Sequence, residues 1–202
     1  MTPEGFCLNE IRSSFIGTSF DALATPRPAG GRPAKTDSKI TPKPGARGEH
    51  IFSVAQHTLL TGEVARRRAG SHDRRLALAV LLHDAPEYVI GDMISPFKVV
   101  MGGSYKEVER RLLDAIHLRF GLPADLPADV AAIIKAADLG AAFLEATALA
   151  GFSAAEARRF FGPRPALPAA AELDYLTPWP ADTAKQRFLQ RFNELQADTQ
   201  AP

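Results

Sequence analysis

The sequence predicts an all-α protein of roughly six helices, preceded by an irregular N-terminal arm. Three observations support this prediction. Apolar residues after residue 48 recur at i, i+3 and i+4 spacing, which is typical of amphipathic helices. Residues that favour helix starts and helix stops bracket these segments. No segment shows the strict alternation of apolar and polar residues that is typical of a half-buried strand.

Residues 1–48 are expected to form the arm. Residues 25–48 read TPRPAGGRPAKTDSKITPKPGARG, with almost no large apolar side chain. Such a segment buries too little surface to offset its ordering entropy, so a flexible or extended conformation is predicted. The arm carries seven basic and four acidic residues, a net charge of +3. It could touch phosphate, but a solvated tail is the favoured interpretation. The domain is therefore placed at residues 49–202.

The helix boundaries follow from capping residues and turn residues. Ser71 is the expected N-cap of a second helix that is apolar nearly all round and should be buried. Ser-x-x-Glu capping boxes are expected at Ser104 and at Ser153. A second proline-rich stretch, with the only tryptophan at Trp179, is expected to be a loop. The six helices are expected over about residues 49–68, 74–91, 104–120, 127–150, 153–161 and 182–195.

Length and composition restrict the class of protein. A chain of 202 residues suits one domain, and a net charge of +1 gives no argument for a nucleic acid polymer or a membrane surface as partner. The single cysteine, Cys7, excludes a disulfide framework and a cysteine-based zinc cluster. No apolar run is long enough to span a bilayer, and no secretory signal is readable. A soluble cytoplasmic protein is expected.

The second predicted helix carries the strongest indication of chemistry. His83 and Asp84 are adjacent within an apolar stretch, where a buried carboxylate is costly unless it is paired or bound to a cation. Neutral imidazole and carboxylate are both good ligands for a divalent first-row ion. Glu87 should lie on the same face one turn later, and Asp92 follows where the helix should end. Pro86 fits one turn into a kinked or restarted segment.

Two more polar side chains fall on apolar stripes of other helices. His57 lies on the first predicted helix and Asp138 on the fourth, in the stripe Ile134, Asp138, Ala141 and Glu145. Taken singly, each would most often be a satisfied buried polar group. Together, His57, His83, Asp84 and Asp138 supply two nitrogens and two oxygens from three helices, which is how helical bundles build metal sites.

These residues resemble the HD-domain metal-dependent phosphohydrolases, whose four metal-binding positions are matched by the set just named. The string from His83 to Asp92, HDAPEYVIGD, followed by SPFK, is similar to the YfbR-like branch. That branch includes 5′-deoxynucleotidases and deoxynucleoside triphosphate hydrolases. The resemblance covers roughly residues 49–195, and it implies an HD-domain helical bundle and a catalytic acidic pair at Glu87 and Asp92.

The sequence departs from the nucleotidases of this branch at one place. They carry an Arg-Trp element before the first metal-binding histidine that helps to hold the sugar and phosphate. No tryptophan precedes His57 here, and Arg47 is the nearest arginine before that residue. Either the substrate is bound differently, or the arm has diverged or been displaced.

The resemblance implies attack of a metal-bound water on the phosphorus of a nucleotide or similar small phosphate ester. Glu87 would position or deprotonate the water. Asp92 would orient that network or bind a sugar hydroxyl, and Lys98 could pair with phosphate. An exposed loop lysine is an equally good interpretation of Lys98. One divalent ion is expected, and Mn²⁺, Co²⁺, Mg²⁺, Zn²⁺ and Fe²⁺ all remain possible from ligand type. The resemblance also suggests a homodimer.

Two other functions remain open from the sequence. The chain could be a non-catalytic HD module that binds a nucleotide or a protein partner for regulation. It could also be a helical bundle in which the histidines and aspartates only pair with one another. Retention of all four ligand types and of both acidic candidates favours the enzyme.

Overall fold

A computed structural model describes residues 50–70, 73–90 and 103–197 of the chain. Within these ranges every regular element is a helix, which confirms the all-α prediction. The predicted arm, Cys7, Asp92 and Lys98 lie outside the described residues. The helices are α3 (Val54–Ala69), α4 (Arg74–Leu81), α5 (Glu87–Ile90), α7 (Gly103–Arg119), α8 (Ala128–Ala148), α9 (Ala154–Phe161), α10 (Ala169–Tyr175) and α11 (Ala181–Ala197).

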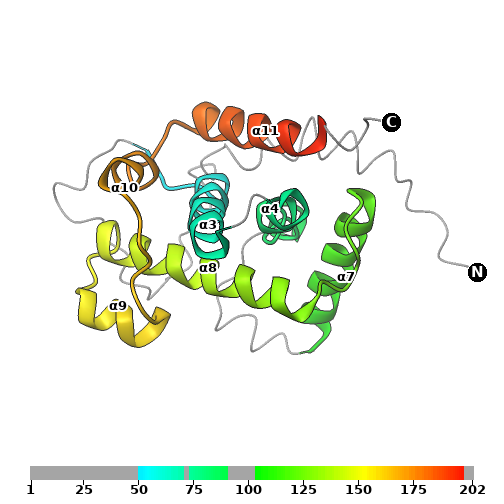
Figure 1. Ribbon diagram of the computed structural model, residues 1–202, viewed down its shortest axis with the longest axis horizontal. Helices are drawn as coiled ribbons and strands as arrows, with labels where there is room; N and C mark the ends of the chain where they lie inside the picture. Colours follow the sequence, from blue (N-terminus) through cyan, green and yellow to red (C-terminus); the bar gives the residue numbers. More distant parts are fainter. Residues whose placement is uncertain (1–49, 71–72, 91–102, 198–202) are drawn as a thin grey trace, which may run out of the picture.

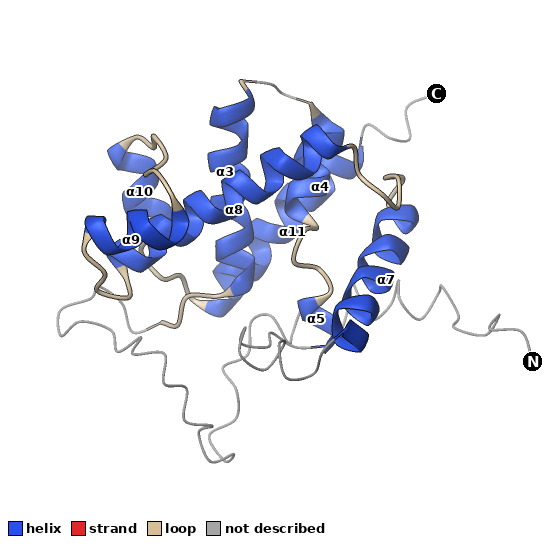
Figure 2. Cartoon of the chain, turned by 90° about the horizontal axis from the view of Figure 1, so that it is seen from below, coloured by secondary structure: helices blue, strands red, loops and turns tan. Residues whose placement is uncertain are grey.

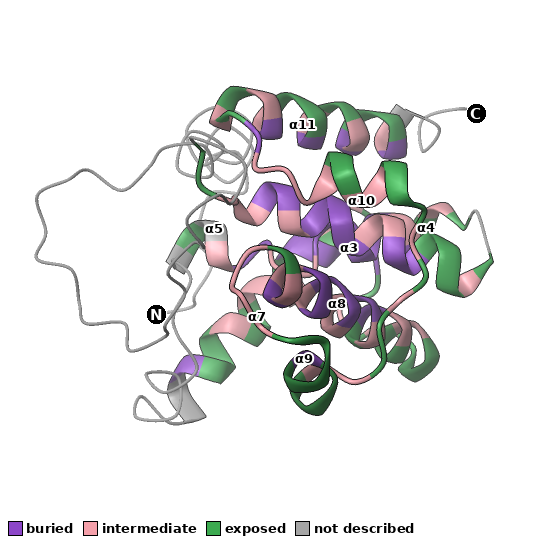
Figure 3. Cartoon of the chain, turned by 90° about the vertical axis from the view of Figure 1, so that its left-hand side faces the viewer, coloured by how far each residue is buried: buried purple, intermediate pink, exposed green. Residues whose placement is uncertain are grey.

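Helix α3 is the centre of the packing. It contacts α8, α4, α11 and α10, and Figure 1 shows it lying between α11 on one side and α8 on the other. Its buried residues include Ala55 and Leu60, both fully enclosed, and Figure 3 shows the buried colour concentrated on α3 and on the middle of α8. Any polar side chain on the α8 side of α3 is therefore held in the interior of the bundle.

Both ends of α3 follow from capping chemistry. The Ser53 side chain accepts a hydrogen bond from the backbone N–H of Gln56, which satisfies one of the free donors at the helix start. The helix begins at Val54, later than the predicted start near residue 49. Gly70 ends it with φ 59°, a left-handed conformation that glycine adopts without a Cβ clash. Three arginines occupy the last turn, where cations favour the helix dipole.

The predicted second helix is two helices joined by a turn. Its N-cap is Asp73 rather than Ser71, because the Asp73 carboxylate accepts from the backbone N–H of Arg75 at 2.8 Å. Helix α4 ends at Leu81, residues 82–86 form a turn, and α5 restarts at Glu87. The fully buried Pro86 explains the break, because its ring clashes with the carbonyl of residue 82 in a continuous helix. The predicted interruption is thereby confirmed.

Helix α8 approaches α3 closely because its facing residues are small. Ala137 and Ala141 are fully buried, and a Cβ added to Gly140 would lie 3.1 Å from the Val64 side chain. A larger residue at position 140 would push the two helices apart. Because Asp138 lies two residues before Gly140, this close approach also brings the carboxylate of Asp138 near α3.

Three boundaries test the capping predictions further. The capping box of Ser153 and Glu156 opens α9 as predicted. Helix α7 already begins at Gly103, so Ser104 lies inside its first turn and the expected N-cap there is wrong. The second proline-rich stretch is not wholly a loop, because it contains α10, which starts directly after Pro168. Figures 1 and 2 both show α10 and α9 at the same end of the molecule.

Helix α11 closes the core from above in the view of Figure 1. Phe188 is fully buried, and the ring of Phe192 packs edge-on against Phe120 with 5.1 Å between ring centroids. Trp179 is buried, and the guanidinium of Arg187 lies 4.1 Å from its ring centroid. Trp179 is therefore a core residue, as expected. In the described residues no helix is both long and apolar enough to cross a membrane.

His117, on α7, gives the fold a dependence on pH. Burial lowers its pKa below 6.5, although the backbone carbonyl of Ala124 opposes the shift. Below pH 6.5 the unfolded chain binds a proton that the folded chain binds less readily, so the free energy of unfolding falls as the pH drops. His117→Gln should therefore lose stability less steeply than wild type between pH 7.5 and 5.5.

Thermal melts at several pH values measure this difference. The other histidines are present in both proteins, so their contributions to the pH dependence of stability cancel. His50→Gln is the matched control, because His50 is exposed. It should follow the wild-type slope. Equal slopes for wild type and His117→Gln would show that His117 does not govern the effect.

Candidate metal centre

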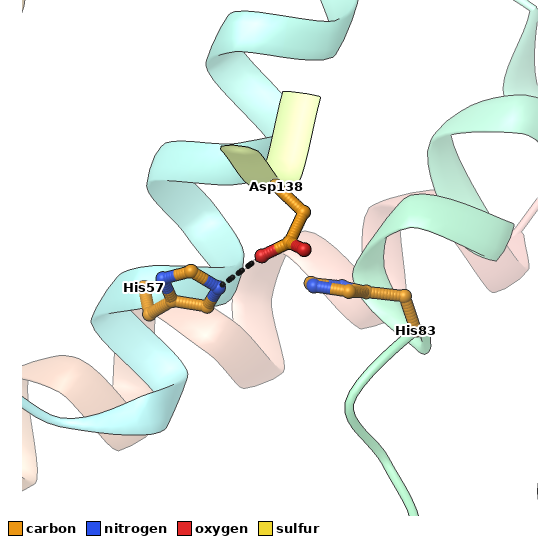
Figure 4. Close-up of side chains that lie close together, drawn as sticks. All are labelled: His57, His83 and Asp138. Atoms are coloured by element: carbon orange, nitrogen blue, oxygen red, sulfur yellow. Dashed lines mark ion pairs between the residues drawn. The ribbon is translucent and has the colours of Figure 1, made fainter. Parts of the chain in front are cut away.

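Three segments of the bundle bring four of the predicted side chains together. His57 lies on the first turn of α3, His83 and Asp84 lie in the turn after α4, and Asp138 lies midway along α8. Figure 4 shows the carboxylate of Asp138 between the rings of His57 and His83. The break at Pro86 matters here, because it places the adjacent His-Asp pair in a turn at the end of the buried α4.

The distances between their polar atoms are short. His57 Nε2 lies 3.4 Å from Asp138 Oδ1 and 3.5 Å from Asp84 Oδ2. His83 Nε2 lies 3.2 Å from the same oxygen of Asp84. Ligand atoms of His57, His83 and Asp138 all lie within 4.8 Å of one another. Asp84 joins this group because its Oδ2 lies close to the Nε2 of both histidines.

The His83 ring is oriented by the backbone. Its Nδ1 lies 2.7 Å from the carbonyl oxygen of Val80, which can only accept, so Nδ1 carries the proton. The other nitrogen, Nε2, is buried and makes no hydrogen bond, although it faces Asp84. A buried nitrogen lone pair with no donor is costly, and a cation at this position would satisfy it.

The His57 ring is held by carboxylates at both nitrogens. Nδ1 lies 2.6 Å from Glu145 Oε1, and Nε2 faces Asp138 and Asp84. Burial lowers the pKa of His57, but its hydrogen bonds with Asp138 and Glu145 outweigh burial and hold the pKa well above its usual value of 6.5. The surroundings of this ring therefore favour positive charge.

Asp138 is held in its ionised form. Burial raises its pKa, but the contacts with His57 and Lys135 outweigh burial and hold the pKa well below the usual value of 3.8. Lys135 Nζ lies 3.0 Å from Asp138 Oδ2, and its side chain is 68% exposed. Among the described residues, the carboxylates of Asp84, Asp138 and Glu145 thus gather here with one lysine, Lys135.

These residues fit a divalent cation. Two imidazoles and two carboxylates are a common donor set for first-row ions, and the local charge favours a cation. The unsatisfied Nε2 of His83 is an independent indication, because a simple His-Asp pairing would leave no buried nitrogen without a hydrogen bond. All four predicted metal ligands therefore lie together in the structure.

The other predicted residues have different positions. Glu87 begins α5, with its backbone N–H donating to the carbonyl of Asp84 at 3.0 Å, so it lies one turn after Asp84. Asp92 and Lys98 lie outside the described residues. A cavity of about 530 Å³ lies between α3, α4 and α11, but none of the four ligand candidates lines it.

Sequence reasoning missed the roles of two residues at this centre, Glu145 and Lys135. Glu145 was noted only as a position on the Asp138 stripe, although its spacing of seven residues from Asp138 places both on one helix face. Lys135 lies three residues before Asp138, a spacing at which a lysine can pair with a carboxylate. Neither spacing by itself shows that the residue approaches a histidine of another helix.

In the part of the chain that the structure describes, helices and the turn after α4 gather two histidines and two aspartates in the order typical of the HD-domain class. The sequence profile of the YfbR-like family, described as 5′-deoxynucleotidase YfbR-like, matches residues 42–152, more than half of the chain. The chain belongs to this family. The matched segment includes all four ligand candidates and Glu87.

The chain is also similar to an uncharacterized protein of Rhodobacter capsulatus. The two are 54% identical over 121 residues, which cover 59% of this chain. The aligned region spans 62% of the length of that relative. Family membership supports a hydrolase of HD type.

Proposed function

We propose that this protein is a metal-dependent phosphohydrolase that releases phosphate from a nucleotide, in the manner of a 5′-deoxynucleotidase. The observation that carries the proposal is the convergence of His57, His83, Asp84 and Asp138, with the buried Nε2 of His83 left without a hydrogen bond. Family membership supports a nucleotide as the class of substrate.

His57, His83, Asp84 and Asp138 would hold the metal. A divalent ion bound there supplies a Lewis acid for a phosphoryl oxygen and makes water more acidic. The protein holds its imidazoles ready for this role, because the Nδ1 of each ring is occupied by an acceptor and Nε2 faces the group of carboxylates.

Glu87 is proposed to accept the proton of the attacking water and return it to the leaving sugar oxygen. Its place at the start of α5, one turn after Asp84, supports this role. Asp92 is proposed to orient the same network. Lys98 and the exposed Lys135 are proposed to contact the substrate phosphate, since Lys135 already lies 3.0 Å from Asp138.

A phosphate-release screen tests the function. We expect the purified protein to release inorganic phosphate from deoxynucleoside monophosphates when a divalent ion is supplied, with Mn²⁺, Co²⁺, Mg²⁺, Zn²⁺ and Fe²⁺ compared in parallel. Chelation should abolish the release, and adding metal back should restore it. Nucleoside di- and triphosphates in the same screen define the phosphate number.

Asp84→Ala is the negative control for this screen, because it removes a carboxylate that faces both histidines. If a folded wild-type protein releases no phosphate from any nucleotide with any of the metals, the enzyme assignment is wrong. Nucleotide binding without release would then identify a non-catalytic HD module.

A further inference from the structure

The two histidines of the metal centre are oriented by different chemical groups. His83 donates from Nδ1 to a backbone carbonyl, that of Val80, at 2.7 Å. His57 instead meets a carboxylate, with 2.6 Å between its Nδ1 and Glu145 Oε1. A backbone carbonyl is present whatever the sequence, whereas the acceptor for His57 depends on the residue at position 145.

Glu145 is well placed to control which nitrogen of His57 carries the proton. An ionised carboxylate can only accept hydrogen bonds, so it favours the tautomer with the proton on Nδ1. That tautomer leaves a lone pair on Nε2, which faces Asp84 and Asp138 at 3.5 and 3.4 Å. The opposite tautomer would point a proton at the position where a metal must bind.

The position of Glu145 excludes a direct ligand role. Nδ1 and Nε2 lie on different sides of the imidazole ring, and Glu145 contacts the Nδ1 side. His83, Asp84 and Asp138 gather near Nε2. Asp138 and Glu145 lie two turns apart on one face of α8, so this helix supplies both a ligand candidate and the carboxylate that orients the ring of another ligand.

The partly buried position of Glu145 strengthens the contact. Its side chain is 22% exposed and that of His57 is 17% exposed, so solvent competes weakly for the hydrogen bond. A short hydrogen bond between an imidazole and a carboxylate in such a site fixes the ring orientation and makes the free nitrogen a better ligand.

We propose that Glu145 is a positioning residue of the metal centre: its carboxylate holds the Nδ1–H tautomer of His57 and so raises the affinity for a divalent ion. This inference rests on the metal-binding part of the proposed function and is independent of which substrate is hydrolysed.

Glu145→Gln tests the proposal with little change in shape. We expect this variant to bind Zn²⁺ about 10–100-fold more weakly than wild type, the loss typical of a group that orients a metal ligand. Competition titration of the full-length protein against a chelator of known affinity measures the change. Glu63→Gln is the matched control, because Glu63 is similarly buried on α3 but pairs with Arg66 and Arg67. It should stay within about twofold of wild type.

Nitrogen-15 NMR of the imidazole rings provides a readout that a merely structural role would not change. In the wild-type protein loaded with Zn²⁺, His57 should carry its proton on Nδ1. In metal-free protein at a pH above the pKa of His57, where the ring carries one proton, the fraction with that proton on Nε2 should be higher in Glu145→Leu than in wild type. His83 should be unchanged, because Val80 still accepts its proton. Glu145→Met, which also lacks a strong acceptor for Nδ1–H, supplies the same comparison if the leucine variant does not fold.

The outcomes separate the two proposals. Tight Zn²⁺ binding by wild type, together with unchanged affinity in Glu145→Gln and an unchanged His57 tautomer in Glu145→Leu, overturns the role of Glu145 but not the metal site. Absence of Zn²⁺ binding by folded wild-type protein overturns both. Weaker binding in Glu145→Gln with normal binding in Glu63→Gln supports both.

Discussion

Glu87→Ala is expected to lower the turnover number by about 10²–10⁴-fold while the metal content of the protein stays at the wild-type level. The reason is that metal binding and proton transfer are assigned to different residues. His57, His83, Asp84 and Asp138 gather as ligand candidates, whereas Glu87 lies one turn further along and is assigned to the proton of the attacking water. Loss of a general base removes transition-state stabilisation without removing a ligand.

Steady-state phosphate release and metal analysis of the same sample check this prediction. Asp84→Ala should lose both metal and activity, which gives the contrast. Glu107→Ala, at an exposed glutamate of α7, should change neither. If Glu87→Ala loses its metal together with its activity, Glu87 is a ligand and the assignment of roles is wrong.

The four ligand candidates could be predicted because each is a polar residue within an apolar helical segment. A His-Asp pair inside an apolar helix is costly without a partner, and His57 and Asp138 interrupt apolar stripes on other helices. The capping box of α9 and the break at Pro86 were predictable for a related reason, since each depends on residues close together in sequence.

Helix α10 was not predicted, because the high proline content of this stretch is typical of a loop. The positions of the prolines, however, are compatible with a helix. Pro168 directly precedes the helix, where proline removes no hydrogen bond that the helix needs, and the following Ala-Ala-Ala-Glu sequence favours helix. Ser71 and Asp73 are both good N-caps, and the choice between them depends on which side chain meets the free N–H groups of the first turn. That geometry does not follow from residue type.

Glu145 and Gln56 were missed for a different reason. A glutamate or glutamine on an amphipathic helix is usually solvated, and its type does not reveal that another helix covers it. The partner of Glu145 is 88 residues away, and the partners of Gln56 are about 120 residues away. Only the packing of α3 against α8, α10 and α11 brings these groups together.

The largest effect on stability is expected at Gln56, whose side chain is fully enclosed. Its amide nitrogen donates to the carbonyls of Tyr175 and Thr177, each at 2.8 Å, and its oxygen accepts from the backbone N–H of Trp179 at 2.9 Å. One side chain thus binds three backbone groups, one at the end of α10 and two in the segment between α10 and α11. Because His57 is the next residue, the same contacts fix the part of α3 that carries a side chain of the candidate metal centre.

Gln56→Leu should reduce the free energy of unfolding by about 3–5 kcal/mol, since each polar group buried without a partner costs about 1–3 kcal/mol. Leucine is similar in volume, so the loss reports hydrogen bonding more than packing. Urea unfolding measures the difference, and Gln190→Leu is the matched control, because Gln190 bonds only an exposed partner, Glu194, and should change stability by less than about 0.5 kcal/mol. A loss below about 1 kcal/mol for Gln56→Leu would show that water or a shifted backbone replaces these bonds. The connection between α10 and α11 would then not depend on Gln56 to hold the start of α3 in place.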